Sequence, residues 1–212
     1  WFRRAVVSFR TMNYQFNLPG FDPPTGAPVP SGQHNLFFAL MPPVAVAEQV
    51  MALAGRLRGM HGLTGRLIDR DRLHVSLLGV APDVSPPVVE AARVLAARVN
   101  SAPFDVVFDR VLSFDRGMDR SQPLVLCHSD HRSLHGLHLL QQMLGLEMKR
   151  AGFPLPAGRS FNPHMTLLYD RRLVPEQTVD EPLRWTATEF VLIDSHVGRS
   201  HYECLGIWPL RP

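Results

Sequence analysis

The fold is decided by the stretch Leu73-His74-Val75-Ser76-Leu77-Leu78 and by a second stretch that matches it, Pro163-His164-Met165-Thr166-Leu167-Leu168. The two histidines lie 90 positions apart, and matching positions carry the same chemical type of residue everywhere except at the first position. Short apolar runs bounded by turn signals are typical of buried strands. We therefore predict one β-strand at each stretch.

Each predicted strand closes a strand-helix-strand unit. The first unit spans residues 36–79 and the second spans residues 124–169, with an apolar strand, then a helix, then the strand that carries the histidine. This pattern predicts an internal duplication, although the two halves share little sequence identity. Within and beyond these units we predict helices over 86–100 and 131–151, a strand over 104–114, and an antiparallel pair over 189–196 and 202–208.

The composition favours one folded domain outside the membrane. The 212 residues are 45% hydrophobic and 19% charged, which is ordinary for a globular protein, and no apolar run approaches the length of a membrane-spanning helix. Residues 1–33 are turn-forming with little periodicity, so we expect an extended or partly disordered lead-in before a single domain at 34–212. Because no signal peptide is recognisable, a cytoplasmic location is expected. We also expect a monomer.

The histidine and the hydroxyl residue of each stretch point the same way. Side chains alternate between the faces of a strand, so His74 lies beside Ser76 and His164 lies beside Thr166. A neutral imidazole can take a proton from an attacking hydroxyl, a protonated one can give a proton to a leaving oxygen, and hydroxyls can donate hydrogen bonds to phosphoryl oxygens. The pattern indicates phosphodiester cleavage without a metal, with core histidines bonded to nearby backbone as the alternative.

A rival interpretation places a metal ion on a different group of histidines. His131, His135 and His138 fall on one stripe of the predicted helix, close to His128. The stripe lies to one side of the apolar face and has no acidic or cysteine partner at a suitable offset, so a solvated flank is favoured. A third histidine-x-serine copy, at His131-Arg132-Ser133, is interpreted as a helix start capped by Ser129 or Asp130.

These stretches resemble the two-histidine phosphoesterase superfamily, and within it the RNA 2',3'-cyclic phosphodiesterases, also called the 2'-5' RNA ligase family. The resemblance runs from about Asn35 to Leu210. It is carried by Leu36-Phe37-Phe38-Ala39-Leu40-Met41-Pro42-Pro43, Leu73-His74-Val75-Ser76-Leu77-Leu78-Gly79, Phe161-Asn162-Pro163-His164-Met165-Thr166-Leu167 and Tyr202-Glu203-Cys204-Leu205-Gly206-Ile207-Trp208-Pro209-Leu210.

The resemblance implies a bilobal, pseudo-twofold α+β fold with both motifs in a central cleft. It also implies hydrolysis of the 2',3'-cyclic phosphate end of an RNA or oligonucleotide to a 2'-phosphate, in some members with reversible 2'-5' ligation, and no cofactor. In family terms His74 is the proton donor and His164 the proton acceptor. The alternatives are an RNA- or nucleotide-binding module with little turnover, and a phosphodiesterase for 2'-5' oligonucleotides.

One departure from the family pattern concerns the substrate end of the site. Many relatives carry an arginine directly after the second motif, where this chain has Tyr169-Asp170 before Arg171-Arg172. We expect Arg159 and Tyr169 to contact the phosphate or the base. A solvated loop arginine and a packed tyrosine are the structural alternatives.

Overall fold

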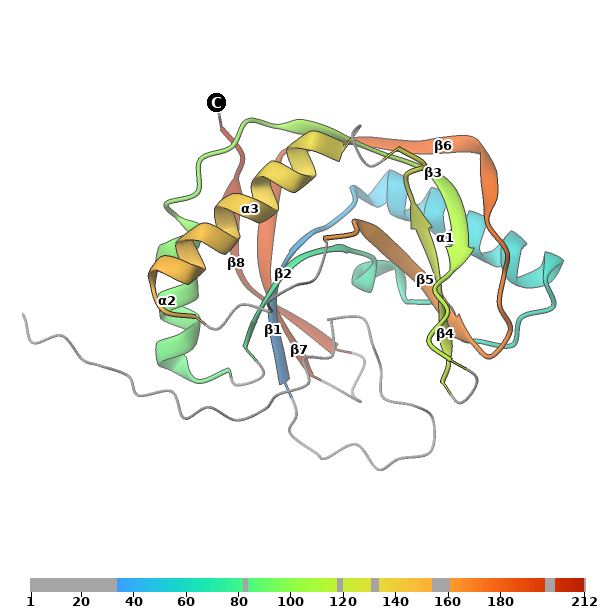
Figure 1. Cartoon of the computed structure of the whole chain (residues 1–212), viewed down its shortest axis with the longest axis horizontal. Coiled ribbons are helices and arrows are strands. Elements are labelled where there is room, and N and C mark those ends of the chain that lie inside the picture. The colour runs from blue at the N-terminus through green and yellow to red at the C-terminus, as the bar shows by residue number, and fades with distance from the viewer. Residues whose placement is uncertain are drawn as a thin grey trace, which may run out of the picture.

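The computed structural model describes residues 34–81, 84–117, 120–130, 134–153, 161–196 and 201–211. The predicted lead-in, residues 1–33, lies outside these ranges. The elements follow in the order β1 (His34–Leu40), α1 (Val44–Met60), a 3-10 turn η1 (Arg70–Arg72), β2 (Val75–Ala81), α2 (Pro86–Ala96), β3 (Phe104–Ser113), β4 (Gln122–Cys127), α3 (His135–Arg150), β5 (His164–Asp170), β6 (Gln177–Ala187), β7 (Glu189–His196) and β8 (His201–Pro209) (Figure 1).

The strands form one eight-stranded sheet in the order β6-β3-β4-β5-β2-β1-β7-β8. Every pairing of named strands is antiparallel. The two halves of the sheet meet where β2 lies beside β5, and there the register consists of the single pair Val75 and Met165. The two predicted strand-helix-strand units are β1-α1-β2 and β4-α3-β5, so the α+β fold with a pseudo-twofold arrangement is confirmed.

The helix of each unit packs against strands of the other half of the sheet. α1 follows β1 in the chain but contacts β5 and β6, whereas α3 follows β4 and contacts β2, together with β3 of its own half (Figure 1). α2 lies against α3 and β8. A continuous cluster of buried apolar side chains, from Leu36 in β1 to Leu210 after β8, fills the space between the helices and the sheet. None of the helices in the described ranges combines the length and apolar composition needed to span a membrane.

Two β-bulges, at matching positions of β2 and β5, control which side chains leave this core. Across β1 and β2 the register passes from Phe38–Leu78 to Ala39–Ser76, so Leu77 is an extra residue. Across β4 and β5 it passes from Leu124–Leu168 to Val125–Thr166, so Leu167 is the extra residue there. Because a bulge inserts one residue into one strand, alternation restarts after it.

The sequence pattern does not predict β6, because Asp180, Glu181 and Pro182 interrupt its apolar residues, yet such residues are tolerated in a strand at the edge of a sheet. The described part of helix α3 begins at His135 after Leu134, and the predicted cap by Ser129 or Asp130 concerns the residues that come before it. Positions 131–133 lie outside the described residues.

Candidate active site

The two histidine motifs face each other across the junction of the two halves. Extending the antiparallel register by one residue on each side of the single pair Val75 and Met165 puts His74 opposite Thr166 and Ser76 opposite His164. Directly opposite side chains on one face have Cβ atoms about 4.5–5.5 Å apart. The four polar side chains therefore form a square on one face of the sheet, with the two imidazoles on its diagonal.

The bulges decide which further residues share this face. Leu77 and Leu78 are both buried, as are Leu167 and Leu168, so each Leu-Leu pair faces the core. Alternation then returns the next residue to the face of the histidines, which is Tyr169 on β5 and Gly79 on β2. A Cβ atom at Gly79 would have no heavy atom within 4 Å. The two half-sites thus differ at this position by a whole phenol side chain.

Both imidazoles are held by the main chain in the same way. Nδ1 of His74 is 2.7 Å from the carbonyl oxygen of Arg72, and Nδ1 of His164 is 2.7 Å from the carbonyl oxygen of Asn162. A carbonyl only accepts, so each Nδ1 carries a proton that it donates. This fixes the orientation of each ring and leaves its Nε2 atom as the site of proton exchange.

The two Nε2 atoms have different partners. Nε2 of His74 lies 3.0 Å from Oγ of Ser76, and in the neutral imidazole it accepts the hydroxyl proton. Among the described residues, neither Nε2 of His164 nor the hydroxyl of Thr166 has a hydrogen-bond partner. Within the described part of the chain, the second half-site therefore keeps both polar atoms available to a ligand.

Two aromatic rings flank His74, and one flanks His164. His74 is 8% exposed and lies 5.2 Å from the ring of Phe37 and 5.5 Å from that of Tyr202. The ring centroid of the half-buried His164 lies 5.0 Å from that of Phe114, in an edge-to-face arrangement. Cζ of Arg72 lies 4.8 Å from the centre of the Tyr202 ring, which places a guanidinium close to His74.

Burial keeps both imidazoles neutral at neutral pH. The pKa of His74 is lowered to about 4, chiefly by desolvation and also by the charges of His164 and Arg72, against the opposing hydrogen bond to the Arg72 carbonyl. Desolvation also lowers the pKa of His164, against the hydrogen bond to Asn162. A group that must act as an acid here therefore has to gain its proton when an anion binds.

The remaining predicted site residues have different outcomes. Tyr169 lies on the face of the histidines, as just described, whereas Arg159 lies outside the described residues. Close to Tyr169 the structure also places Arg116. Burial lowers the pKa of Arg116, and the opposing effect of Tyr169 is smaller. The sequence did not single out Arg116, Phe114, Arg72 or Tyr202, because each comes from a loop, a 3-10 turn or a partner strand whose register only the folded sheet defines.

Asp170, which follows Tyr169 at the end of β5, has a structural role. Its Oδ2 accepts the main-chain N–H groups of Thr64 at 2.6 Å and Gly65 at 2.8 Å, and Oδ1 accepts that of Arg172 at 2.9 Å. Burial acts to raise the pKa of Asp170, but these hydrogen bonds outweigh burial and lower it. A Cβ at Gly65 would collide with the carbonyl oxygen of Tyr169, so this close approach requires glycine.

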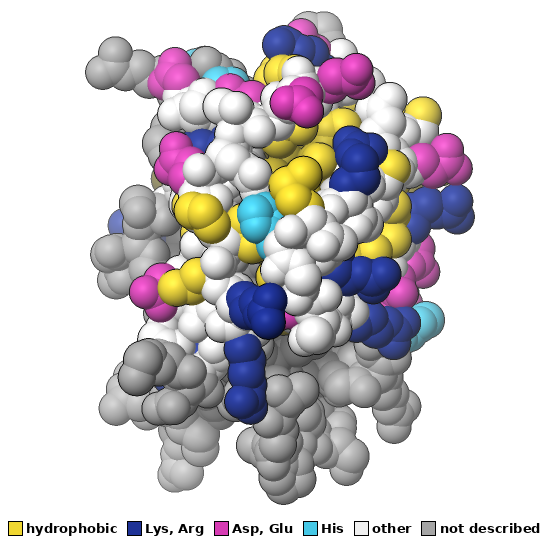
Figure 2. All heavy atoms as spheres, turned by 90° about the vertical axis from the view of Figure 1, so that its right-hand side faces the viewer, with side chains coloured by type: hydrophobic (Ala, Val, Ile, Leu, Met, Phe, Trp, Pro, Cys, Tyr) yellow, Lys and Arg dark blue, Asp and Glu magenta, His cyan; other side chains and the backbone are white. Residues whose placement is uncertain are grey.

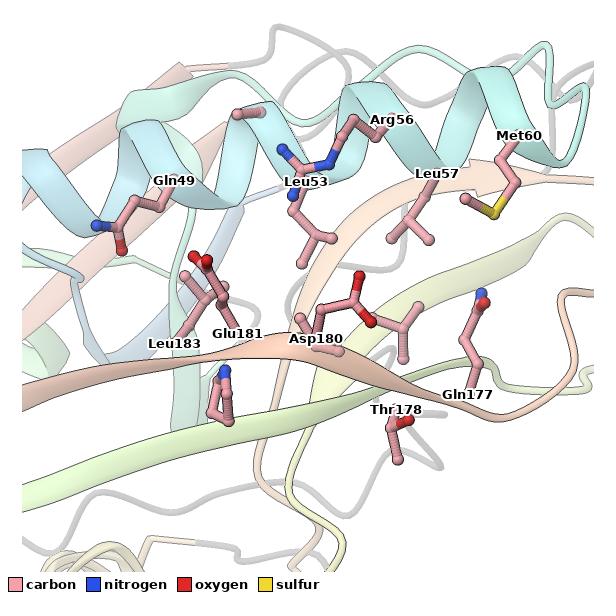
Figure 3. Close-up of a pocket in the computed structure, with 14 residues that line it drawn as sticks. Gln49, Leu53, Arg56, Leu57, Met60, Gln177, Thr178, Asp180, Glu181 and Leu183 are labelled. Atoms are coloured by element: carbon pink, nitrogen blue, oxygen red, sulfur yellow. The ribbon is translucent and has the colours of Figure 1, made fainter.

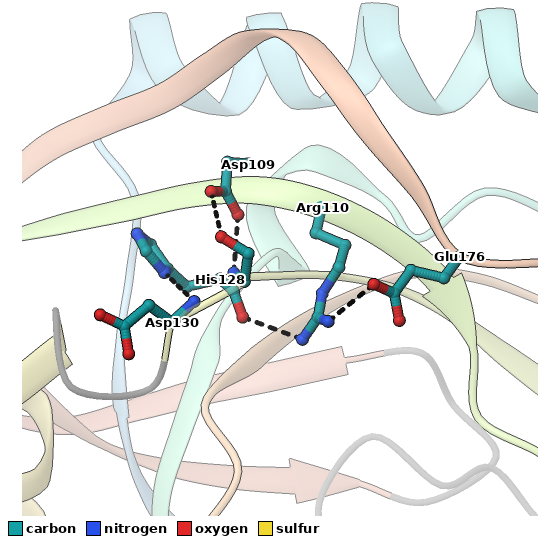
Figure 4. A network of polar contacts seen from close by, with 6 residues as sticks. Asp109, Arg110, His128, Asp130 and Glu176 are labelled. Carbon is teal, nitrogen blue, oxygen red and sulfur yellow. Dashed lines mark hydrogen bonds and ion pairs between the residues drawn. The ribbon is translucent and has the colours of Figure 1, made fainter.

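The described members of the rival histidine group do not assemble a metal site. Nδ1 of His128 accepts the main-chain N–H of Asp130 at 2.7 Å, within a network that fixes the end of β4 (Figure 4). In that network Arg110 bridges the carbonyl of His128 and the carboxylate of Glu176, at 3.0 and 2.9 Å. On α3, His135 is exposed and His138 packs edge-on against Phe161. His131 lies outside the described residues.

A groove of about 670 Å³ lies away from the histidines, between α1 and β6. Leu53, Arg56 and Met60 of α1 face Asp180 and Glu181 of β6 across it (Figure 3). The surface at the right of Figure 1 shows apolar side chains between acidic and basic ones (Figure 2). Because the groove lies on the helix-covered side of the sheet, it is separate from the face that carries His74 and His164.

Comparisons with known proteins agree with this geometry. The family model of the 2'-5' RNA ligase superfamily matches residues 42–199. The crystal structure of E. coli LigT in its apo form is 28% identical with a TM-score of 0.68, and the match covers 85% of this chain and 99% of that chain. The LigT complex with 3'-AMP is 27% identical with a TM-score of 0.69, with the same coverage.

A Thermus thermophilus protein, 20% identical, has the same fold with a TM-score of 0.69 over 84% of this chain and 98% of that one. The comparison with curated proteins gave no match. The family model covers well over half of the chain, including both histidine motifs. The chain therefore belongs to the 2'-5' RNA ligase superfamily, a group within the two-histidine phosphoesterases.

Proposed function

We propose that the chain is a metal-independent phosphodiesterase that hydrolyses the terminal 2',3'-cyclic phosphate of RNA to a 2'-phosphate. The observation that carries this proposal is the diagonal pair of imidazoles, each held at Nδ1 by a carbonyl two residues before it. A phosphorus atom between the two Nε2 atoms would have a base on one side and an acid on the other. In-line displacement requires this disposition.

In the proposed reaction a water molecule attacks phosphorus while Nε2 of His164 takes one of its protons. The bond from phosphorus to O3' breaks, and His74 gives the proton on its Nε2 to O3'. The products are a 2'-phosphate and a free 3'-hydroxyl. At the end of the reaction His164 is protonated and His74 is neutral. With the 5'-hydroxyl of a nucleic acid in place of water, the same steps would make a 2'-5' bond. The reverse reaction would break such a bond.

Substrate binding favours the protonated form of His74, which the proposed reaction requires. With a pKa of about 4, the free imidazole is neutral near pH 7. A phosphodiester anion beside it favours the protonated form and raises this pKa. Once Nε2 carries a proton, it no longer accepts from the hydroxyl of Ser76, whose hydrogen is released toward a phosphoryl oxygen. Ser76 would then stabilise the developing charge together with Thr166.

The nucleoside end of the substrate would lie beside Tyr169 and Arg116. Tyr169 shares the face of His164 beyond the bulge, and Arg116 lies near it. The E. coli relative was crystallised with 3'-AMP and with ATP, which are adenine nucleotides with a phosphate at one end. These ligands support a nucleotide end as the part recognised here. Arg159 is kept as a predicted phosphate contact.

The test is a product analysis on 2',3'-cyclic, 2'-5' and 3'-5' linked substrates with a strong chelator present. We expect turnover of the 2',3'-cyclic end to a 2'-phosphate, unaffected by the chelator, with a bell-shaped pH profile. Loss of activity on chelation while the protein stays folded, or a rate that rises steadily into alkaline pH, would contradict two-histidine catalysis. Cleavage of 2'-5' linkages alone would identify a 2'-5' oligonucleotide phosphodiesterase, and binding without turnover would identify a binding module.

A further inference from the structure

A second cluster of histidines lies at the beginning of β1. His34 is the first residue of β1, and Asp194 and His196 lie at the end of the neighbouring β7. Nδ1 of His34 is 2.9 Å from each carboxylate oxygen of Asp194, and Nε2 of His196 is 3.5 Å from Oδ2 of the same carboxylate. One nitrogen or oxygen atom from each of the three residues lies within 4.8 Å of the other two.

The cluster has an unsatisfied atom that faces its centre. Asp194 is 5% exposed, and Nε2 of His196 is shielded from solvent without a hydrogen-bond partner among the described residues. Leaving a buried polar atom unpaired costs about 1–3 kcal/mol, so such an atom calls for a partner. The nearest charged group to this nitrogen is the carboxylate that already binds His34.

This cluster is separate from the catalytic pair. His34 is opposite His196 and Leu36 is opposite Asp194, and Leu36 belongs to the core on the helix-covered face of the sheet. The catalytic face instead carries Phe37, which contacts His74. Along β1, Ala39, the neighbour of Ser76, lies five positions after His34. Five positions correspond to about 17 Å at the rise of a strand.

The ligand set suits a borderline divalent ion. Two imidazole nitrogens and one carboxylate are the ligands that zinc accepts in three-ligand sites, whereas magnesium and calcium take oxygen ligands almost exclusively. At bond lengths of about 2.0–2.1 Å, a tetrahedral ion needs ligand atoms about 3.4 Å apart. The separations of 2.9 and 3.5 Å bracket this value. Oε2 of Glu203 on β8 lies 3.9 Å from Nε2 of His196, outside the group of three residues whose ligand atoms gather within 4.8 Å, so this exposed side chain would have to turn inward to become a fourth ligand.

We propose that His34, Asp194 and His196 bind a zinc-class divalent ion, with Glu203 closing the coordination shell. The ligands come from β1, β7 and β8, which are consecutive strands at one edge of the sheet. The ion therefore ties three strand ends together and stabilises the fold. It takes no part in catalysis, because it lies on the other face of the sheet from the two motif histidines.

The first experiment titrates Zn²⁺ into the chelator-stripped full chain by calorimetry, beside a thermal melt. We expect one ion per chain in the low micromolar range, and a Tm raised by about 5–10 °C when free Zn²⁺ exceeds Kd about 100-fold. His34→Gln and His196→Gln should each weaken binding at least about tenfold. His135→Gln, which alters an exposed histidine of the rival stripe, is the matched control and should bind like the parent.

X-ray absorption of the zinc-loaded parent protein keeps the test independent of any variant that fails to fold. Scattering from two imidazoles with oxygen ligands supports the site, and a shell without imidazole overturns it. No binding, or binding that survives His34→Gln and His196→Gln, also overturns it. If His135→Gln or His74→Gln alone abolishes binding, the ion lies elsewhere and the proposal is wrong.

Discussion

The two half-sites of this sheet share their framework and differ in their surroundings. Each has a histidine whose Nδ1 is held at 2.7 Å by a carbonyl two residues earlier, a hydroxyl two residues later, and a bulge after it. His74, however, is packed between Phe37 and Tyr202 and bonded to Ser76, while Nε2 of His164 has no partner among the described residues. The two half-sites thus direct their imidazoles with the same geometry but place them in different environments.

The strongest test of this comparison removes each imidazole. His74→Ala and His164→Ala should each lower turnover on a 2',3'-cyclic substrate by about 10²–10⁴, the usual share of a general acid or base. Added imidazole should restore part of the activity of His164→Ala, because its half-buried position admits a small molecule. It should not rescue His74→Ala, whose side chain is 8% exposed in the parent.

Turnover with and without imidazole, measured beside circular dichroism to check folding, decides the outcome. Equal rescue of both variants would show that the two environments do not differ in access. Near-normal activity in either folded variant would remove that histidine from the mechanism.

The hydroxyls should separate the half-sites more sharply. Ser76→Ala and Thr166→Val should each lose about 2–4 kcal/mol of transition-state stabilisation, as expected for a donor to a developing oxyanion. Only Ser76→Ala should also move the pH profile. Ser76 donates to neutral His74 at 3.0 Å, and losing a hydrogen bond to the neutral form raises the pKa of the imidazole.

Rate against pH for both variants, together with their Tm values, tests this difference. A Ser76→Ala protein that is destabilised but keeps normal turnover would show that the hydroxyl only packs. A shifted profile in Thr166→Val would show that both hydroxyls bond to a histidine during turnover.

Stability against pH should report the burial of His74. Below its ordinary pKa of 6.5 the unfolded imidazole binds a proton, while the folded one does so only near its pKa of about 4. Stability is therefore complete above about pH 6.5 and falls as the pH drops through about 4, by up to about 3 kcal/mol. Denaturant unfolding at several pH values should show this slope, and His74→Gln should flatten it.

His164 has a lowered pKa for the same reason and acts in the same direction. His164→Gln should therefore flatten another part of the slope. An unchanged slope in His74→Gln would mean that other groups, such as the carboxylates, account for the acid sensitivity.

Much of this arrangement could be predicted from two short stretches of sequence. The repeated histidine and hydroxyl predicted the strands, the duplication and the shared face, because alternation within one strand is a local property. Strict alternation from His164 would put Tyr169 on the opposite face, so its position beside the histidines depends on the bulge after Thr166. The buried Leu167-Leu168 pair was the available signal of a bulge, but its position is set by hydrogen bonds to β4.

Other features depend on residues that the fold brings together. His34 lies 160 positions or more before Asp194 and His196, so no local motif reveals the cluster. The Arg72 carbonyl that holds His74 belongs to the main chain, and any residue type could provide it. β6 has the charges and proline of a loop and forms a strand only because it pairs with β3 at the sheet edge.

The smallest expected effect concerns the position at which the half-sites differ outright, Tyr169 on β5 and Gly79 on β2. If the phenol binds the nucleoside end, Tyr169→Phe should raise KM for a dinucleotide cyclic phosphate several-fold with little change in kcat, since one hydrogen bond contributes about 0.5–1.5 kcal/mol. Tyr169→Ala should raise KM further by removing the ring. Gly79→Ala, whose added Cβ meets open space, is the matched control and should leave KM and Tm unchanged. If Tyr169→Phe instead lowered Tm together with activity, the tyrosine would be assigned to packing around Arg116. The asymmetry between the half-sites would then lie in stability rather than in substrate binding.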